Sequence, residues 1–241
     1  MFKKTMLAAA GIIVLLAGAF LVWSLTPLGP MPEAEAAVQS AVEAASNDWL
    51  VFQPPNSQPE TGFIFYPGGR VDYRSYAPLA RAVADGGYLV IIVPMRLNLA
   101  VFSPDRAAQV IDAYPQIRRW AVGGHSLGGA MAARFARRSP DKVSGLVLLA
   151  SYPAESDSLA GSQTSVISIY ADQDGLASLD KIESSRALLP QDTRYVVIEG
   201  GNHAQFGWYG AQNGDGQAAI SRAEQQSLTA SAIISFLEGL R

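Results

Sequence analysis

A glycine–x–serine–x–glycine pattern stands in the middle of the chain, formed by Gly124, Ser126 and Gly128. An apolar stretch precedes it and a helical pattern follows it, as for a serine nucleophile on a sharp strand-to-helix turn. The glycines leave room for the strained turn, and the N-terminus of the following helix favours negative charge. The pattern predicts Ser126 as a nucleophile, and the simpler alternative is a glycine-rich turn with an incidental serine.

A serine nucleophile needs a general base, and the chain contains two histidines. His125 adjoins Ser126 in the turn, so we expect its side chain to point elsewhere and to pack beneath the turn. His203 lies on a glycine loop directly after the predicted strand 194–199. Because functional residues of open α/β sheets lie on loops at the carboxyl ends of strands, we predict His203 as the base.

The carboxylate that orients the histidine is expected between Ser126 and His203 in chain order. Asp172 and Asp174 both follow the predicted strand 166–170. Either carboxylate would hydrogen-bond the imidazole and stabilise the cation formed in the reaction. We favour Asp174 and keep Asp172 as the alternative; the unused aspartate would be a turn residue.

An oxyanion in this site needs two backbone donors. Leu127 directly follows the nucleophile and is expected to supply one N–H group. The second is expected from Gly69, in the loop after the predicted strand 62–66. Gly68 and Gly69 let the backbone approach a substrate closely, and a plain turn is the alternative interpretation.

Several side chains near these positions are candidates for substrate binding. Gly68 lies beside the predicted donor, and Phe206 follows the predicted base and would border an apolar pocket. Arg70 and Arg96 would hold a substrate carboxylate or, alternatively, pair with nearby acids at the surface. The loop 213–216 suggests calcium but lacks the remaining EF-hand ligands, so we interpret it as a turn.

Composition limits the other function classes. The 241-residue chain has a net charge of -3, without the basic excess expected of a nucleic-acid-binding protein. Hydrophobic residues make up 49% and charged residues 16%, which is ample apolar material for a core. Cysteine is absent, which excludes disulfides and thiol catalysis, and two histidines argue against a multi-histidine metal site.

Short apolar runs alternate with helical patterns from about residue 47 onward. This alternation predicts an α/β fold, with an open, mostly parallel sheet covered by helices on both faces. The predicted strands are 49–53, 62–66, 88–93, 120–122, 144–150, 166–170 and 194–199, and the predicted helices are 76–85, 104–113, 128–138, 181–189 and 222–240. Only about 15 residues separate strands 144–150 and 166–170, so we do not expect a bulky lid.

The N-terminus is predicted to cross a membrane. Residues 7–25 form an uncharged apolar run of 19 residues. As a helix this run would measure roughly 28 Å, close to the hydrocarbon core of about 30 Å. Lys3 and Lys4 favour a cytoplasmic N-terminus, which places the bulk of the chain outside the membrane. A cleaved signal peptide, with Ala34-Glu35-Ala36 as the cleavage site, is the alternative.

Three regions follow from these patterns. Residues 1–26 are expected to be a signal anchor, residues 27–46 a linker and residues 47–241 a catalytic domain. The linker starts with proline and glycine and is expected to end in a short helix with Pro32 near its start.

With these motifs, the chain resembles the α/β-hydrolase superfamily, and most closely its small, lidless, dienelactone-hydrolase-like bacterial members. The resemblance covers about residues 49–240 and implies Asp174 rather than Asp172 as the acid. Two positions depart from the family pattern: Ala171 replaces a glycine, and Pro67 replaces a frequent histidine. The matching segments are YPGGRVDYRSYAPLARAVADGGYLVIIVP, GGHSLGGAMAARFA, ISIYADQDGLAS and EGGNHAQFG. Dienelactone hydrolases proper use cysteine, so their substrate does not carry over.

The site residues and the resemblance together imply a serine hydrolase with Ser126, His203 and Asp174 as its triad. It would cleave carboxylic-ester-like bonds of a small molecule through an acyl-enzyme, with no metal or organic cofactor. The membrane is the second expected partner, with a single-pass location in the bacterial cell membrane and the catalytic domain on the extracytoplasmic side. An acyltransferase or perhydrolase with the same triad is the alternative; a non-catalytic binding module fits the intact triad poorly.

Overall fold

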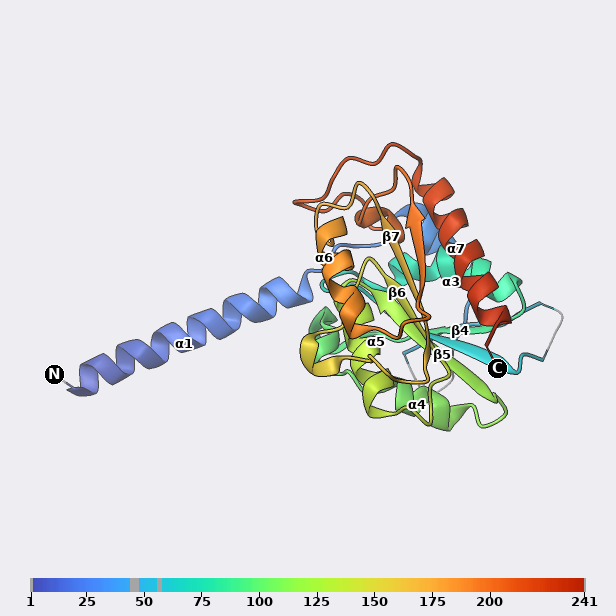
Figure 1. Cartoon of the computed structure of the whole chain (residues 1–241). Coiled ribbons are helices and arrows are strands. Elements are labelled where there is room, and N and C mark those ends of the chain that lie inside the picture. The colour runs from blue at the N-terminus through green and yellow to red at the C-terminus, as the bar shows by residue number, and fades with distance from the viewer. Residues whose placement is uncertain (1, 44–47, 56–57, 241) are drawn as a thin grey trace.

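The computed structural model describes residues 2–43, 48–55 and 58–240, and their centre is an eight-stranded sheet (Figure 1). The strand order is β1-β2-β4-β3-β5-β6-β7-β8. From β4 to β8 neighbouring strands are parallel, whereas β2 pairs antiparallel with β4 and β1 pairs antiparallel with β2. The strands are β1 (Val42–Glu43), β2 (Leu50–Phe52), β3 (Thr61–Tyr66), β4 (Leu89–Ile92), β5 (Arg119–His125), β6 (Gly145–Leu149), β7 (Ser165–Ala171) and β8 (Arg194–Ile198).

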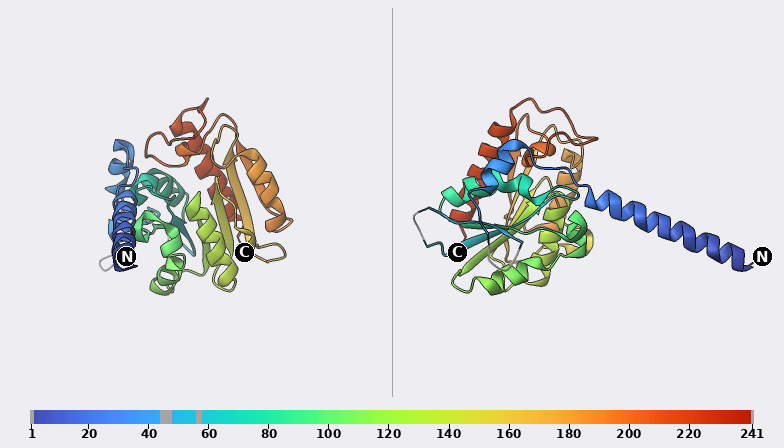
Figure 2. Two further views of the ribbon diagram at one scale, coloured as in Figure 1. Left: turned by 90° about the vertical axis from the view of Figure 1, so that its left-hand side faces the viewer. Right: turned by 180° about the vertical axis from the view of Figure 1, so that it is seen from behind.

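Helices lie on both faces of the sheet (Figure 2). The α-helices are α1 (Phe2–Leu25), α2 (Pro32–Val38), α3 (Ala77–Asp85), α4 (Arg106–Ala113), α5 (Leu127–Arg138), α6 (Leu179–Ser185) and α7 (Arg222–Glu238). The 3-10 helices are η1 (Tyr73–Tyr76), η2 (Arg96–Asn98), η3 (Ala100–Phe102), η4 (Glu155–Asp157), η5 (Arg186–Leu188) and η6 (Ala204–Phe206). This arrangement confirms the predicted α/β class with a mostly parallel sheet.

The core is divided by the sheet into two apolar clusters. Phe65 of β3 packs with side chains of α3 and α7 such as Ile233 on one face. Ile64 packs with side chains of α4 and α5 such as Phe135 on the other face. Neighbouring residues of β3 face opposite clusters because side chains alternate along a strand. Every residue of β3 is therefore buried, which is why it forms a continuous apolar run in the sequence.

Most predicted elements are present with small shifts of their ends. The predicted helix 104–113 begins at Arg106 with Asp105 as its N-cap residue. The predicted helix 181–189 is α6 followed by η5. Between β6 and β7 the chain has one short 3-10 helix, η4, so no bulky lid is inserted there. The sequence did not predict β1, because an element of two residues carries no periodic pattern.

The helix α1 extends away from the sheet, as Figure 1 shows. Its described apolar side chains are exposed, with Leu15 at 73% and Leu16 at 66%. Within the residues that the structure describes, we find no helix with the length and apolar character needed to cross a membrane. The transmembrane anchor predicted for residues 1–26 is therefore not supported.

The segment after α1 packs against the sheet domain. Helix α2 begins at Pro32, as predicted, and contacts α3, with Ala34 fully buried. Leu28 forms a parallel β-bridge with Val71. Much of the predicted linker is thus part of the folded unit. The predicted boundary at residues 46–47 lies outside the described residues.

Candidate active site

Ser126 lies between the end of β5 and the start of α5, with φ 51° and ψ -122°. A positive φ is uncommon for a residue with a side chain, so the surroundings must hold this turn. The Ser126 N–H donates to the Leu149 carbonyl at 2.9 Å. The Ser126 carbonyl in turn accepts from the Ser151 hydroxyl at 2.6 Å. Strand β6 and the loop after it therefore fix the conformation that the sequence pattern predicted.

The turn leaves no space for a side chain at Gly124. A Cβ atom there would lie 2.4 Å from the Tyr66 carbonyl oxygen and 2.7 Å from the Gly128 carbonyl carbon. Non-bonded heavy atoms do not lie this close together, so a side chain at Gly124 would force the surrounding backbone to move. Glycine is required because the backbones of β3, β5 and α5 meet at this point.

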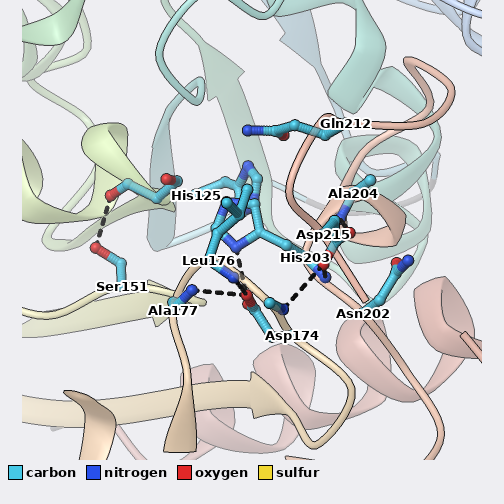
Figure 3. A network of polar contacts seen from close by, with 12 residues as sticks. His125, Ser151, Asp174, Leu176, Ala177, Asn202, His203, Ala204, Gln212 and Asp215 are labelled. Carbon is cyan, nitrogen blue, oxygen red and sulfur yellow. Dashed lines mark hydrogen bonds and ion pairs between the residues drawn. The ribbon is translucent and has the colours of Figure 1, made fainter. Parts of the chain in front are cut away.

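His203 and Asp174 form a buried hydrogen-bonded pair, in which His203 Nδ1 lies 2.8 Å from Asp174 Oδ2 (Figure 3). An ionised carboxylate only accepts hydrogen bonds, so Nδ1 is the donor and carries the proton. The other ring nitrogen, Nε2, has no hydrogen-bond partner among the described residues. His203 and Ser126 line the same pocket, although no hydrogen bond joins their side chains in this structure. The imidazole is thus held in the tautomer that can accept a proton at Nε2.

The structure brings Asp174, and not Asp172, to the imidazole. The second oxygen of Asp174 accepts from the backbone N–H groups of Leu176 at 2.7 Å and Ala177 at 2.6 Å. These two bonds fix the carboxylate so that Oδ2 faces the ring. The Asp172 carboxylate accepts from the Gly200 N–H at 2.7 Å and so joins the loops after β7 and β8.

His125 packs beneath the serine turn, as the sequence indicated. Its Nδ1 lies 2.9 Å from the Tyr76 hydroxyl, which accepts from the Gly68 N–H at 3.0 Å. The ring centroids of His125 and His203 are 4.4 Å apart. Burial, and then the neighbouring His203, lower the pKa of His125 well below its usual value of 6.5. His125 is therefore a neutral residue that links the loop after β3 to the ring of His203.

The two predicted oxyanion donors lie next to each other. Leu127 is the first residue of α5, so its N–H has no acceptor within the helix, and Leu127 lines the pocket with Ser126. A Cβ atom on Gly69 would lie 3.0 Å from the Leu127 side chain. Among the described residues, no acceptor is found for the Gly69 N–H. Both groups are thus positioned at the same end of the sheet as Ser126.

The three predicted substrate contacts, Gly68, Arg70 and Phe206, have other partners in the structure. Gly68 uses its N–H on the Tyr76 hydroxyl. Arg70 donates to the carbonyls of Trp23 at 2.8 Å and Thr26 at 2.7 Å, so it neither faces the pocket nor pairs with an acid. Phe206 is fully buried and packs against His125. The pocket lining includes none of these three residues.

The pocket beside Ser126 is small and largely apolar, with a volume of about 290 Å³. Its lining comes from α5 and from the loops after β6, β7 and β8. The lining residues are Ser126, Leu127, Ala130, Ala150, Ser151, Tyr152, Leu176, Ala177 and His203. Tyr152 and Leu176 were not predicted from the sequence, although both follow strands that end at this edge. Their position directly after a strand is the feature of the sequence that could have identified them as pocket residues.

In the described part of the chain, no group of three or more histidine and acidic side chains is placed to hold a metal ion. The loop 213–216 is a turn, as predicted, with Gly214 at φ 84°.

The sequence profile of the alpha/beta hydrolase family matches residues 62–227. The chain belongs to this family. The match includes the serine turn, Asp174 and His203. No curated protein sequence matches the chain.

Solved structures support the same fold for this alpha/beta hydrolase. The membrane phospholipase A described as a bacterial virulence factor is 16% identical, with a TM-score of 0.64, and the match covers 99% of this chain and 96% of that chain. The propionate-bound thermophilic esterase of Thermogutta terrifontis, a Planctomycetes species, is 13% identical, with a TM-score of 0.61 and coverage of 83% and 94%. The esterase domain of a Rhodothermus marinus protein is 12% identical, with a TM-score of 0.61 and coverage of 78% and 90%.

Proposed function

We propose that this alpha/beta hydrolase cleaves carboxylic esters with Ser126 as nucleophile, His203 as general base and Asp174 as the carboxylate that orients the base. One observation carries the proposal: the 2.8 Å bond between His203 Nδ1 and Asp174 Oδ2 leaves Nε2 without a hydrogen-bond partner among the described residues, and His203 lines the same pocket as Ser126. An imidazole with Nδ1 protonated and Nε2 free is the form that activates a serine hydroxyl.

In the first step, Nε2 of His203 takes the hydroxyl proton as Ser126 Oγ attacks the ester carbonyl. The imidazolium that forms is stabilised by the Asp174 carboxylate, which remains ionised. His203 then gives its proton to the leaving alcohol, and the acyl group stays on Ser126. Water repeats the sequence with the same proton transfers and releases the acid.

The negative charge of the tetrahedral intermediate is stabilised by the backbone. The N–H groups of Leu127 and Gly69 are its proposed donors, and the N-terminus of α5 adds a partial positive charge at the same place. A positioned donor of this kind is worth about 10²–10³ in turnover. The backbone supplies this stabilisation without a charged side chain in the pocket lining.

The pocket favours a small, uncharged acyl group. Its volume of about 290 Å³ and its side chains Leu127, Ala130 and Leu176 suit short aliphatic chains rather than charged groups. The esterases among the structural neighbours, one of which holds propionate, support ester hydrolysis in general. We therefore propose short-chain esters as the substrate class.

The test is a series of p-nitrophenyl esters of increasing acyl length. The wild-type chain is expected to prefer short acyl groups, and Ser126→Ala is expected to lose at least about 10³-fold in kcat/KM. Ser139→Ala, a serine at the other end of α5, is the control and should retain wild-type turnover. Full activity in Ser126→Ala would reject the proposal.

A further inference from the structure

A single carboxylate outside the proposed triad holds the backbone around it. Oδ1 of Asp215 accepts from the N–H groups of Gly175 at 3.2 Å, His203 at 3.2 Å and Gly216 at 2.8 Å. Oδ2 accepts from the Ala204 N–H at 2.8 Å (Figure 3). Asp215 lies between η6 and α7, in the loop 213–216 that the sequence predicted to be a turn.

The partners of this carboxylate flank the bond between the base and its acid. Gly175 directly follows Asp174, and Ala204 directly follows His203. Asp215 therefore joins the backbone on the acid side to the backbone on the base side. The bond that it spans is the 2.8 Å contact between His203 Nδ1 and Asp174 Oδ2.

Neutral hydrogen bonds also join the loops after β7 and β8 to each other and to the loop 213–216. The Gln173 N–H donates to the Gly201 carbonyl at 3.0 Å. The Asn202 amide donates to the Gly216 carbonyl at 2.8 Å. Among the described side chains, Asp215 alone accepts hydrogen bonds both from the residue after Asp174 and from the residues at His203.

We propose that Asp215 is a positioning residue of the esterase site, an inference that rests on the proposed function of Ser126, His203 and Asp174. Its carboxylate fixes the separation and direction of His203 relative to Asp174, so that Nδ1 meets Oδ2 while Nε2 stays free to accept a proton. Hydrogen bonds to an ionised acceptor are shorter and stronger than neutral ones, which suits a carboxylate for this task.

Substitution of Asp215 by asparagine or by alanine removes its hydrogen bonds in two steps. Asparagine is almost isosteric with aspartate, but one of its two oxygens becomes an NH₂ group, which cannot accept a hydrogen bond. Asp215→Asn therefore loses either the Ala204 bond or the bonds made by Oδ1. Asp215→Ala loses all four. Misplacement of reacting groups by about 1 Å costs about 10²-fold in rate, so small shifts of His203 are measurable.

The experiment compares the full-length wild-type chain with Asp215→Asn and Asp215→Ala. Asp141→Asn, an exposed carboxylate at the other end of the sheet, is the control for loss of charge. We expect kcat for a short p-nitrophenyl ester to fall by about 10-fold in Asp215→Asn and about 10²-fold in Asp215→Ala, with KM changed much less. The control should match the wild type.

A second readout separates positioning from loss of stability. The downfield proton resonance of the His203 Nδ1–H bonded to Asp174 should shift or broaden in Asp215→Asn, at a temperature where circular dichroism shows the variant folded. An unchanged resonance, or an unchanged kcat in the folded variant, would overturn the proposal. If Asp215→Ala does not fold, Asp215→Asn decides the matter alone.

The same experiment distinguishes this inference from the proposed function. If the wild-type chain hydrolyses no ester, the proposed function fails. The resonance comparison still tests whether Asp215 sets the contact between His203 and Asp174, because it requires no turnover.

Discussion

Gly128 lies directly against the backbone of Tyr66: a Cβ atom on Gly128 would be 2.2 Å from the Tyr66 carbonyl oxygen. The first turn of α5 thus meets the end of β3 with no room for a methyl group. The distance concerns function as well as packing, because Leu127 and Ser126 immediately precede Gly128.

Gly128→Ala is expected to destabilise the fold and to displace the start of α5. Overpacking of this kind typically costs about 1–3 kcal/mol, and helix propensity offsets less than that. Urea unfolding measures the change in free energy, and kcat should fall together with it. Gly239→Ala is the matched control, since its added Cβ would meet only the Phe236 carbonyl oxygen, at an ordinary 3.5 Å. Equal stability of the two variants would contradict this account.

Replacement by asparagine should lower kcat much more at Asp174 than at Asp172. Asp174→Asn places an amide against His203 Nδ1 and favours the wrong tautomer, so kcat is expected to fall by about 10³–10⁴. Asp172→Asn keeps an oxygen that can accept from the Gly200 N–H, and we expect a loss of a few-fold at most. Steady-state kinetics on one ester decides between them. Equal losses in both variants would argue against Asp174 as the acid.

Arg70 is expected to support the loop of Gly69 rather than to bind substrate. It has φ 56° and donates to the carbonyls of Trp23 and Thr26. Arg70→Ala should lower kcat several-fold through Gly69. The ratio of KM for an anionic ester to KM for a neutral ester of similar size should stay the same. A selective rise of KM for the anionic ester would instead show that Arg70 contacts the substrate.

Stability should fall as the solution becomes acidic, because His125 is buried in its neutral form. Its pKa is lowered in the folded chain relative to about 6.5 when unfolded, so the unfolded state binds the proton more readily. Above about pH 6.5 this difference does not reduce the free energy of unfolding. Below that pH the free energy of unfolding falls by up to about 1.4 kcal/mol per pH unit, until the pH reaches the folded-state pKa.

Urea unfolding between pH 7.5 and pH 5.5 measures this slope. His125→Phe keeps an aromatic ring but cannot titrate, so its free energy of unfolding should vary less with pH, whatever its absolute value. Identical slopes would mean that His125 is not the group responsible.

The sequence was sufficient to predict the sheet and three of the candidate site residues. Ser126 has a local spacing pattern, and Asp174 and His203 follow buried strands, where parallel topology collects side chains. The choice between Asp172 and Asp174 needed the family resemblance, because both follow the same strand. Only coordinates show that the Asp172 carboxylate turns to Gly200 instead.

The predicted substrate contacts Gly68, Arg70 and Phe206 lie outside the pocket lining for a different physical reason. A position in a loop does not determine where a long side chain points, and the positive φ of Arg70 accompanies a side chain directed to the end of α1. Asp215 was missed as a site residue because its partners are backbone N–H groups, which leave no mark in the sequence. Tyr152 and Leu176 were missed although their strand-end positions were visible.

The packing of residues 27–38 bears on how the protein should be shortened for expression. The Met31 N–H donates to the Trp208 carbonyl at 2.8 Å, and Ala34 is fully buried. Recombinant protein that starts at residue 47 would lose this covering and expose apolar surface of α3, with a tendency to aggregate. A start at residue 23 keeps the covering and the Trp23 and Thr26 carbonyls that accept from Arg70, and it removes most of the projecting helix, so it should give the better-behaved sample for crystallisation.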